Sequence, residues 1–202
     1  MRYLNLWTIF LFALFTSCST QKAAKAERLA KELEEINEKD SECGPNKNYS
    51  IKERLKFYPF NKAEKVVLIS FDETGEYFNI TPVAQHKTID SLIKETVTLK
   101  SEKIEELTHL LYNIGYQNPK AKLHIVSHAS CYNPRNAILF MNKYNKVIDY
   151  ISICFQCNRH ELSSRKIKDI NYCLDKYSLL ANFFKSSGIK IGTTLPPKDD
   201  EQ

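Results

Sequence analysis

Cysteine is the residue type in this chain with the widest range of possible chemistry, and the 202 residues include six cysteines. Cys154 and Cys157 form a Cys-x-x-Cys motif, and Cys131 precedes them. Neighbouring thiols can form a disulfide, bind zinc or exchange disulfides with other thiols. Which of these applies depends on the elements that bring the thiols together.

A β-hairpin is predicted to place three of these cysteines close together. Residues 137–141 and 147–155 are apolar runs on either side of a polar loop, a pattern typical of a hairpin. Pairing outward from the centre of that loop puts Cys131 opposite Cys157, with Cys154 nearby. Directly opposed residues have Cβ atoms roughly 4.5–5.5 Å apart, a separation that suits a disulfide.

The interpretation that we favour is a structural disulfide from Cys131 to Cys157 or Cys154. Oxidising compartments favour such bridges, and the hairpin geometry suits one. Five cysteines follow Cys18, so at least one of them stays free.

A tetrahedral zinc site is the second interpretation, because zinc ligand pairs often have the two-residue gap of the Cys-x-x-Cys motif. The candidate ligands are Cys131, Cys154, Cys157, Cys173, His128 and His160. No cofactor is expected unless this group binds zinc. The second half of the usual paired spacing is missing from the sequence.

A redox-active motif and a group of unlinked buried thiols are the remaining interpretations. A redox Cys-x-x-Cys works best at a helix N-terminus, whereas this one ends a predicted strand. Cys173 lies in a predicted helix, where a cysteine commonly fills a core. His128 could form a nucleophilic pair with Cys131, but no third orienting residue is evident, so an ordinary histidine is the simpler interpretation.

The elements that position these residues are predicted to form one α+β domain over residues 46–195. A mainly antiparallel sheet carries two packed helices. The predicted strands cover residues 66–71, 96–99, 123–126, 137–141 and 147–155, with a further short strand at 189–191. The predicted helices cover residues 101–114 and 163–185. Asp149 interrupts an apolar strand, and we expect it at the edge of the sheet.

The N-terminal segment predicts where the protein resides. Residues 1–17 contain a charged start, an apolar run and small residues before Cys18, which is the outline of a signal peptide. On these residues the segment resembles the lipobox signal of bacterial lipoproteins, which implies a lipid on Cys18. An uncleaved anchor helix is the alternative. Either interpretation implies attachment to the inner or outer membrane of a bacterium, facing the periplasm.

A helical spacer is predicted between the lipid and the domain, within residues 18–45. Its apolar positions recur at three- and four-residue steps, and Glu27 is spaced to pair with Lys31 on a helix surface. The stretch Cys43-Gly44-Pro45-Asn46 is expected to end this helix. Residues 196–202 form a polar tail.

The composition excludes several functions. The net charge of +5 comes from scattered charges of both signs, without a basic stripe, so a nucleic-acid partner is not expected. No Gly-rich phosphate loop, HExxH, GxSxG or EF-hand spacing occurs in the sequence. Enzymatic activity is therefore less expected than binding or scaffolding.

Two segments carry a second resemblance. Residues 131–138 (CYNPRNAI) and 153–157 (ICFQC) are similar to segments of small uncharacterised bacterial lipoproteins. The resemblance implies a self-contained lipoprotein domain and brings no activity. The predicted function is a binding or scaffolding lipoprotein of the cell envelope with a protein partner. The alternative is a zinc-binding or thiol–disulfide redox protein.

Overall fold

The computed structural model describes residues 42–72, 80–117 and 132–196, together with Lys25, Glu27, Arg28 and Lys31. These four residues of the spacer are helical, and Lys31 Nζ lies 3.6 Å from Glu27 Oε1. Cys18, His128, Cys131 and the strand predicted at 123–126 lie outside the described residues.

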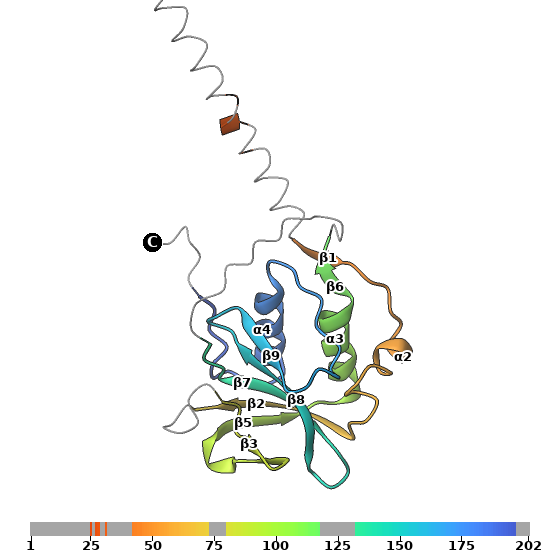
Figure 1. Ribbon diagram of the computed structural model, residues 1–202, viewed down its shortest axis with the longest axis vertical. Helices are drawn as coiled ribbons and strands as arrows, with labels where there is room; N and C mark the ends of the chain where they lie inside the picture. Colours follow the sequence, from red (N-terminus) through yellow and green to blue (C-terminus); the bar gives the residue numbers. More distant parts are fainter. Residues whose placement is uncertain are drawn as a thin grey trace, which may run out of the picture.

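A five-stranded antiparallel sheet forms the centre of the domain (Figure 1). Its strand order is β5–β2–β7–β8–β9, and every neighbouring pair is antiparallel. The strands are β2 (Lys65–Phe71), β5 (Ile93–Thr98), β7 (Asn136–Met141), β8 (Val147–Cys154) and β9 (Arg159–Leu162). The predicted α+β class with a mainly antiparallel sheet is confirmed.

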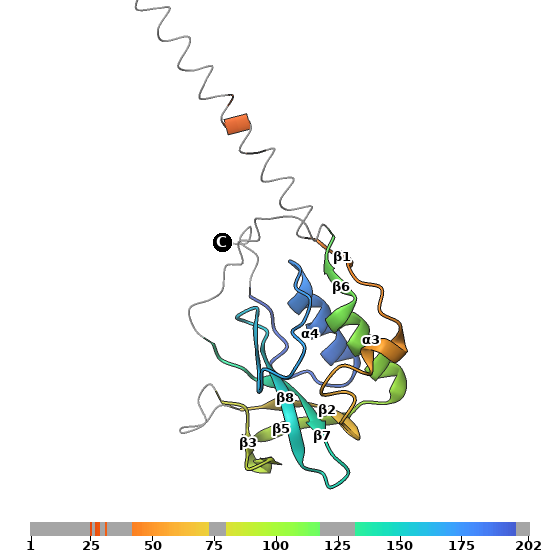
Figure 2. The ribbon, with the colours of Figure 1, turned by 45° about the vertical axis from the view of Figure 1, so that its right-hand side comes forward.

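Two helices pack side by side on one face of this sheet (Figure 2). They are α3 (Ser101–Tyr112) and α4 (Lys176–Ser186), and a short helix, α2 (Ile51–Arg54), lies against α3. The main core forms between the helices and the sheet. It includes Leu68, Ile138, Ile151, Leu107, Leu111, Leu180 and Phe184.

The opposite face of the sheet has a second, smaller core. Alternate residues of a strand point to opposite faces, so Val67 and Ile69 lie here while Leu68 lies among the helices. Val83 packs against this face from a small hairpin of β3 (Val83–Ala84) and β4 (Lys87–Thr88), which a short 3₁₀ turn, η2 (Asp90–Leu92), follows. Burial on both faces explains the continuous apolar run of β2.

A two-stranded sheet joins the start of the domain to the end of α3. Its strands are β1 (Cys43–Pro45) and β6 (Ile114–Tyr116), with Cys43 opposite Tyr116. The stretch that was expected to end the spacer helix therefore forms a strand, and the folded domain begins before residue 46.

The second predicted helix is wrong in its first half, because α4 begins only at Lys176. Residues 163–175 satisfy their polar groups through contacts with other elements instead of a helical ladder. Asn171 donates from its backbone nitrogen to Leu111 O (2.8 Å) and from Nδ2 to Tyr112 O (2.5 Å). Ile167 and Ile170 are still buried in the core, which explains the helix-like apolar spacing.

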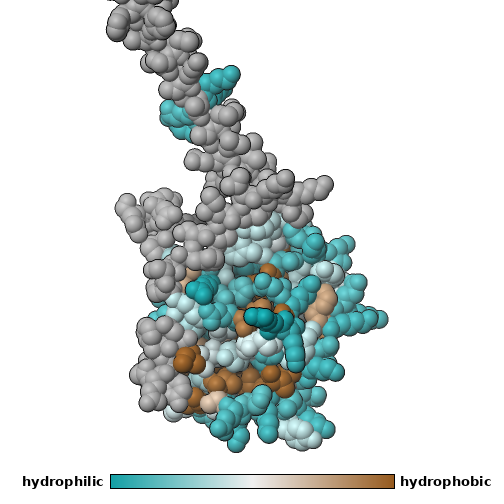
Figure 3. Space-filling model, in the orientation of Figure 1, coloured by the Kyte–Doolittle hydropathy of each residue, from teal (hydrophilic) through white to brown (hydrophobic). Residues whose placement is uncertain are grey.

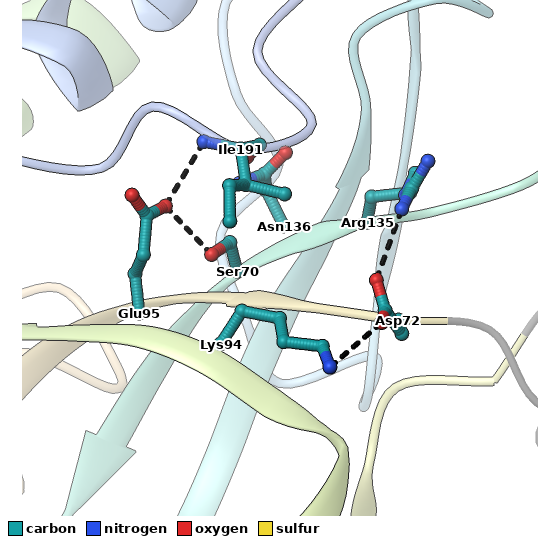
Figure 4. A network of polar contacts seen from close by, with 7 residues as sticks. All are labelled: Ser70, Asp72, Lys94, Glu95, Arg135, Asn136 and Ile191. Carbon is teal, nitrogen blue, oxygen red and sulfur yellow. Dashed lines mark hydrogen bonds and ion pairs between the residues drawn. The ribbon is translucent and has the colours of Figure 1, made fainter.

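The strand predicted at 189–191 is also wrong, since side chains hold this segment (Figure 4). The Glu95 carboxylate accepts hydrogen bonds from Lys190 N (3.0 Å), Ile191 N (2.9 Å) and Ser70 Oγ (2.7 Å). Asn136 Nδ2 donates to Ile191 O (2.9 Å). Burial tends to raise the pKa of Glu95, but these hydrogen bonds outweigh it and lower the pKa below its usual value.

Asp149 is buried, not at the sheet edge as predicted. Only 8% of the residue is exposed, and its carboxylate accepts hydrogen bonds from Tyr58 Oη (2.7 Å), Ser164 Oγ (2.7 Å) and Ser163 Oγ. Burial, together with the hydrogen bond to Asp149, raises the pKa of Tyr58 to about 12. Three hydroxyl donors thus replace the water that the carboxylate loses on folding.

Lys176 connects α4 to the end of α3 from a fully buried position. Its Nζ donates to Leu110 O (2.5 Å) and Ile114 O (2.7 Å), carbonyls in the last turn of α3 and just beyond it. Burial lowers the pKa of Lys176 to about 7. A neutral amine still has two N–H groups, enough for both carbonyls.

Replacing this lysine should change how stability depends on pH. An unfolded lysine has a pKa of about 10.4, so between pH 7 and that value the unfolded chain binds more protons at Lys176, and stability rises with pH. We expect the free energy of unfolding of the wild type to rise from pH 7 to about pH 9.5 relative to K176M, by up to ~1.4 kcal/mol per pH unit. Guanidinium titrations across this range measure the difference.

The exposed Lys62 provides the matched control, since K62M should keep the wild-type slope. If the free energy of unfolding of K176M changed with pH as steeply as that of the wild type, Lys176 would not be a buried amine that loses its proton on folding.

Candidate functional site

The described cysteines form two disulfides, Cys43–Cys173 and Cys154–Cys157. The predicted pairing of Cys131 with Cys157 or Cys154 is therefore wrong, because the latter two are bonded to each other. The favoured interpretation was a structural disulfide, and the structure does contain disulfides, although between other cysteines.

The hairpin register explains the difference. Met141 faces Val147 beside the loop, but a bulge then shifts the register so that Phe140 faces Asp149. Strand β8 then ends at Cys154, and the chain turns into β9, where Arg159 pairs back with Cys154. The Cys-x-x-Cys motif spans this turn instead of extending β8 along the segment that precedes β7.

Zinc binding at these cysteines would require free thiolates. Cys154, Cys157 and Cys173 are disulfide-bonded and do not supply thiolates in this state. Within the described ranges, no group of three or more His, Cys, Asp or Glu side chains is arranged to hold a metal ion. Cys154 and Cys157 are only 2% and 4% exposed, so their bond acts as a buried staple of the β8–β9 turn.

A cleft of about 470 Å³ lies between β9, the end of β6, the segment before α4 and α4 itself. Small-molecule sites commonly have volumes of roughly 300–1,000 Å³. Its polar and aromatic lining comprises Tyr116, Arg159, His160, Asp169, Tyr172 and Tyr177. Of these, the sequence drew attention only to His160, as a possible zinc ligand.

The Cys43–Cys173 disulfide fixes one wall of this cleft. Cys43 lies opposite Tyr116 in the β1–β6 pair, and Cys173 directly follows Tyr172. Tyr116 N donates to Tyr172 O (2.9 Å), which joins the two tyrosines. The disulfide and this hydrogen bond together lock the backbones that carry both rings.

The Cys154–Cys157 disulfide fixes the opposite wall. It closes the turn that leads into β9, and β9 supplies Arg159, His160 and Leu162 to the cleft. The two disulfides therefore support the two sides of one cleft.

A hydrogen-bonded chain crosses the cleft from Asp169 to Tyr177. His160 Nε2 lies 3.2 Å from Asp169 Oδ1, and His160 Nδ1 lies 2.9 Å from Tyr177 Oη. An ionised carboxylate only accepts, so Nε2 donates to Asp169, and in neutral imidazole Nδ1 accepts from the Tyr177 hydroxyl. The hydrogen bond from His160 lowers the pKa of Asp169, which keeps this carboxyl ionised.

The hydrogen bonds from Asp169 through His160 to Tyr177 position these side chains, and Tyr177 is not an activated nucleophile. Tyr177 is only 2% exposed, and burial raises the pKa of its phenol well above the usual range. Its hydroxyl is engaged by His160 Nδ1.

Aromatic rings form a continuous row along the cleft. The ring centroids of Tyr116 and Tyr172 are 5.7 Å apart, those of Tyr172 and Tyr177 are 6.0 Å apart, and His160 is 6.2 Å from Tyr177. Burial raises the pKa of both Tyr116 and Tyr172, so these phenols stay neutral. Tyr116 and Tyr172 thus give the cleft neutral, half-buried rings with polar tips, and Tyr177 lies buried behind them.

Linear sequence gave little sign of this site. Tyr172 is adjacent to Cys173, and Tyr116 follows shortly after the end of the helix predicted over residues 101–114. Contacts between distant segments bring these tyrosines together: the pairing of β1 with β6, the Cys43–Cys173 bond and the hydrogen bond from Tyr116 N to Tyr172 O.

Comparisons with known proteins do not identify the chain. No protein-family model, no curated protein and no solved structure matches it. In the part of the chain that the structure describes, no helix is both long enough and apolar enough to span a bilayer.

Loss of the two disulfides should reduce stability unequally. Cys43 and Cys173 are 130 residues apart in sequence, and Cys154 and Cys157 are three apart. The loop-entropy relation gives ~5 kcal/mol for the longer loop and ~2 kcal/mol for the shorter one. The two double variants, C43A with C173A and C154A with C157A, can be compared by chemical denaturation. Equal losses, or a larger loss for the second, would contradict the larger contribution of the Cys43–Cys173 bond to stability.

Removing the Tyr177 hydroxyl should weaken the hydrogen-bonded chain without changing the packing. We expect Y177F to lose about 1 kcal/mol of unfolding free energy, since His160 Nδ1 loses its donor. Y144F is the matched control, because Tyr144 is 71% exposed, and it should lose almost nothing. Thermal and chemical denaturation measure both variants, and equal stability of the two would show that the hydroxyl is not engaged.

Proposed function

We propose that this chain is a lipid-anchored binding module of the bacterial cell envelope, held to a membrane through Cys18 and facing the periplasm. The cleft between β9 and the segment before α4 is its binding surface. The observation that carries the binding role is the support of this cleft from both sides by disulfides, which keeps its walls in place before any ligand arrives.

Two further features support the location. Disulfides that staple a fold are usual in oxidising compartments such as the periplasm, and rare in the bacterial cytosol. Residues 1–17 have the features of a signal peptide, and Cys18 stands where a lipobox has its lipidated cysteine. Cys43 follows Cys18 by 25 residues, so a short spacer separates the lipid from the first disulfide.

The Cys43–Cys173 bond also suits a tethered domain. Force on the spacer enters the domain at β1, a strand of three residues. The disulfide transmits that force directly to the segment before α4, so β1 is not peeled from β6. A covalent clamp at the first residue of the domain fits a protein attached by its N-terminus.

Expression of the full chain in a bacterial host tests the anchor. We expect the wild type in the membrane fraction, with residues 1–17 removed and a lipid mass on the N-terminal peptide that begins at Cys18. The C18S variant should lose the lipid mass and retain the signal segment. S19A, which leaves the cysteine intact, is the matched control and should behave as the wild type.

Intact-mass and peptide mass spectrometry give the readout. Wild-type protein without lipid on Cys18, or with residues 1–17 still attached, would contradict the lipid-anchor proposal.

A further inference from the structure

The chemistry of the cleft lining limits the ligands that it can bind. Leu162 and Ile170 add aliphatic surface to the row of tyrosine rings. One face of the domain is mainly hydrophilic, with a band of apolar residues in the lower part of the view (Figure 3). A suitable ligand therefore has one apolar side for the rings and many polar groups elsewhere.

Unused hydrogen-bonding atoms lie on both sides of the cleft. Asp169 Oδ1 accepts from His160 and from Ile170 N, whereas Oδ2 has no partner among the described residues. The Asp169 side chain is 76% exposed, so this oxygen can accept from a ligand. Across the cleft, Arg159 uses Nη2 to contact Glu161 (3.0 Å), and its Nε and Nη1 bond to no described residue.

The charges of the cleft oppose an ionic ligand. An anion would meet the ionised Asp169, while a cation would meet Arg159, which is paired with Glu161. Arg159 is also held in place, because its guanidinium lies 4.9 Å from the centre of the Tyr132 ring and Tyr132 Oη is 2.5 Å from Ser152 Oγ. The cleft lining therefore contains a fixed donor, an exposed acceptor and neutral tyrosine rings.

We propose that this cleft binds a neutral saccharide. A sugar ring presents a face of C–H groups that can lie on one of the tilted rings of Tyr172 and Tyr116, and it has hydroxyls that both donate and accept. One hydroxyl donates to Asp169 Oδ2, and another accepts from Arg159. The inference rests on the proposed binding function of the cleft and specifies its ligand class.

Two sources could provide such a ligand: the N-acetylated amino sugars of a cell-wall glycan and the glucose-type polysaccharides outside the cell. Purified full-length mature protein in detergent is screened on an array of neutral, acidic and aminated glycans. Calorimetry with N,N′-diacetylchitobiose and with maltotriose then distinguishes the two sources. Binding to neutral glycans of either kind is the expected result.

The variants test whether the bound sugar occupies this cleft. Y172A removes a ring, and R159A removes an exposed donor with little risk to folding; each should weaken binding at least tenfold. Y144A is the matched control. Tyr144 lies in the exposed loop before β8, whereas β9 pairs with the other end of that strand. The Y144A variant should bind as the wild type does.

Several results would overturn the inference: no glycan binding, binding only to acidic or only to aminated glycans, or binding that Y172A and R159A leave unchanged. These results are separate from the anchor test, which reads lipid on Cys18. A lipidated protein that binds no glycan would refute the saccharide proposal and leave the lipid anchor intact. A protein that binds neutral glycans but carries no lipid on Cys18 would refute the anchor and leave the saccharide proposal intact.

Discussion

The bond between Cys43 and Cys173 is the constraint on which the rest of the site depends. It joins the first strand of the domain to the irregular segment before α4, across 130 residues of sequence. Without it, β1 would be held by three residue pairs with β6 and by a few hydrogen bonds of the flanking residues Glu42 and Asn46. With it, Tyr116 and Tyr172 have fixed positions, and the cleft has a wall that does not depend on a ligand.

Buried polar side chains do similar work elsewhere in the domain. Lys176 joins α4 to the carbonyls near the end of α3, and Asp149 joins β8 to Tyr58 and to the start of the segment before α4. Glu95 holds residues 190 and 191 against the sheet. Each joins segments that are distant in sequence, because a buried ionisable group must find partners when it leaves water.

Local patterns in the sequence predicted the regular elements well. The apolar run of β2, the β7–β8 hairpin and the helical spacing of α3 each reflect interactions within one element or between neighbours, which a linear pattern records. The bulge beside Met141 was not visible, and it shifted the register on which the cysteine pairing depended.

Non-local interactions account for what the sequence did not reveal. The apolar spacing of Ile167 and Ile170 reflects burial in the core, so periodicity alone suggested a longer helix than α4. Of the cleft residues, only His160 stood out in the sequence, because no local signal connects Tyr116 with Tyr172 or Asp169 with His160.

The support of the cleft depends on which cysteines are bonded to each other. Non-reducing peptide mapping of the protein from membranes tests this pairing most directly. We expect one peptide pair joined through Cys43 and Cys173 and a bond within the peptide that contains Cys154 and Cys157. A peptide joined through Cys131 to Cys157 or Cys154 would contradict it.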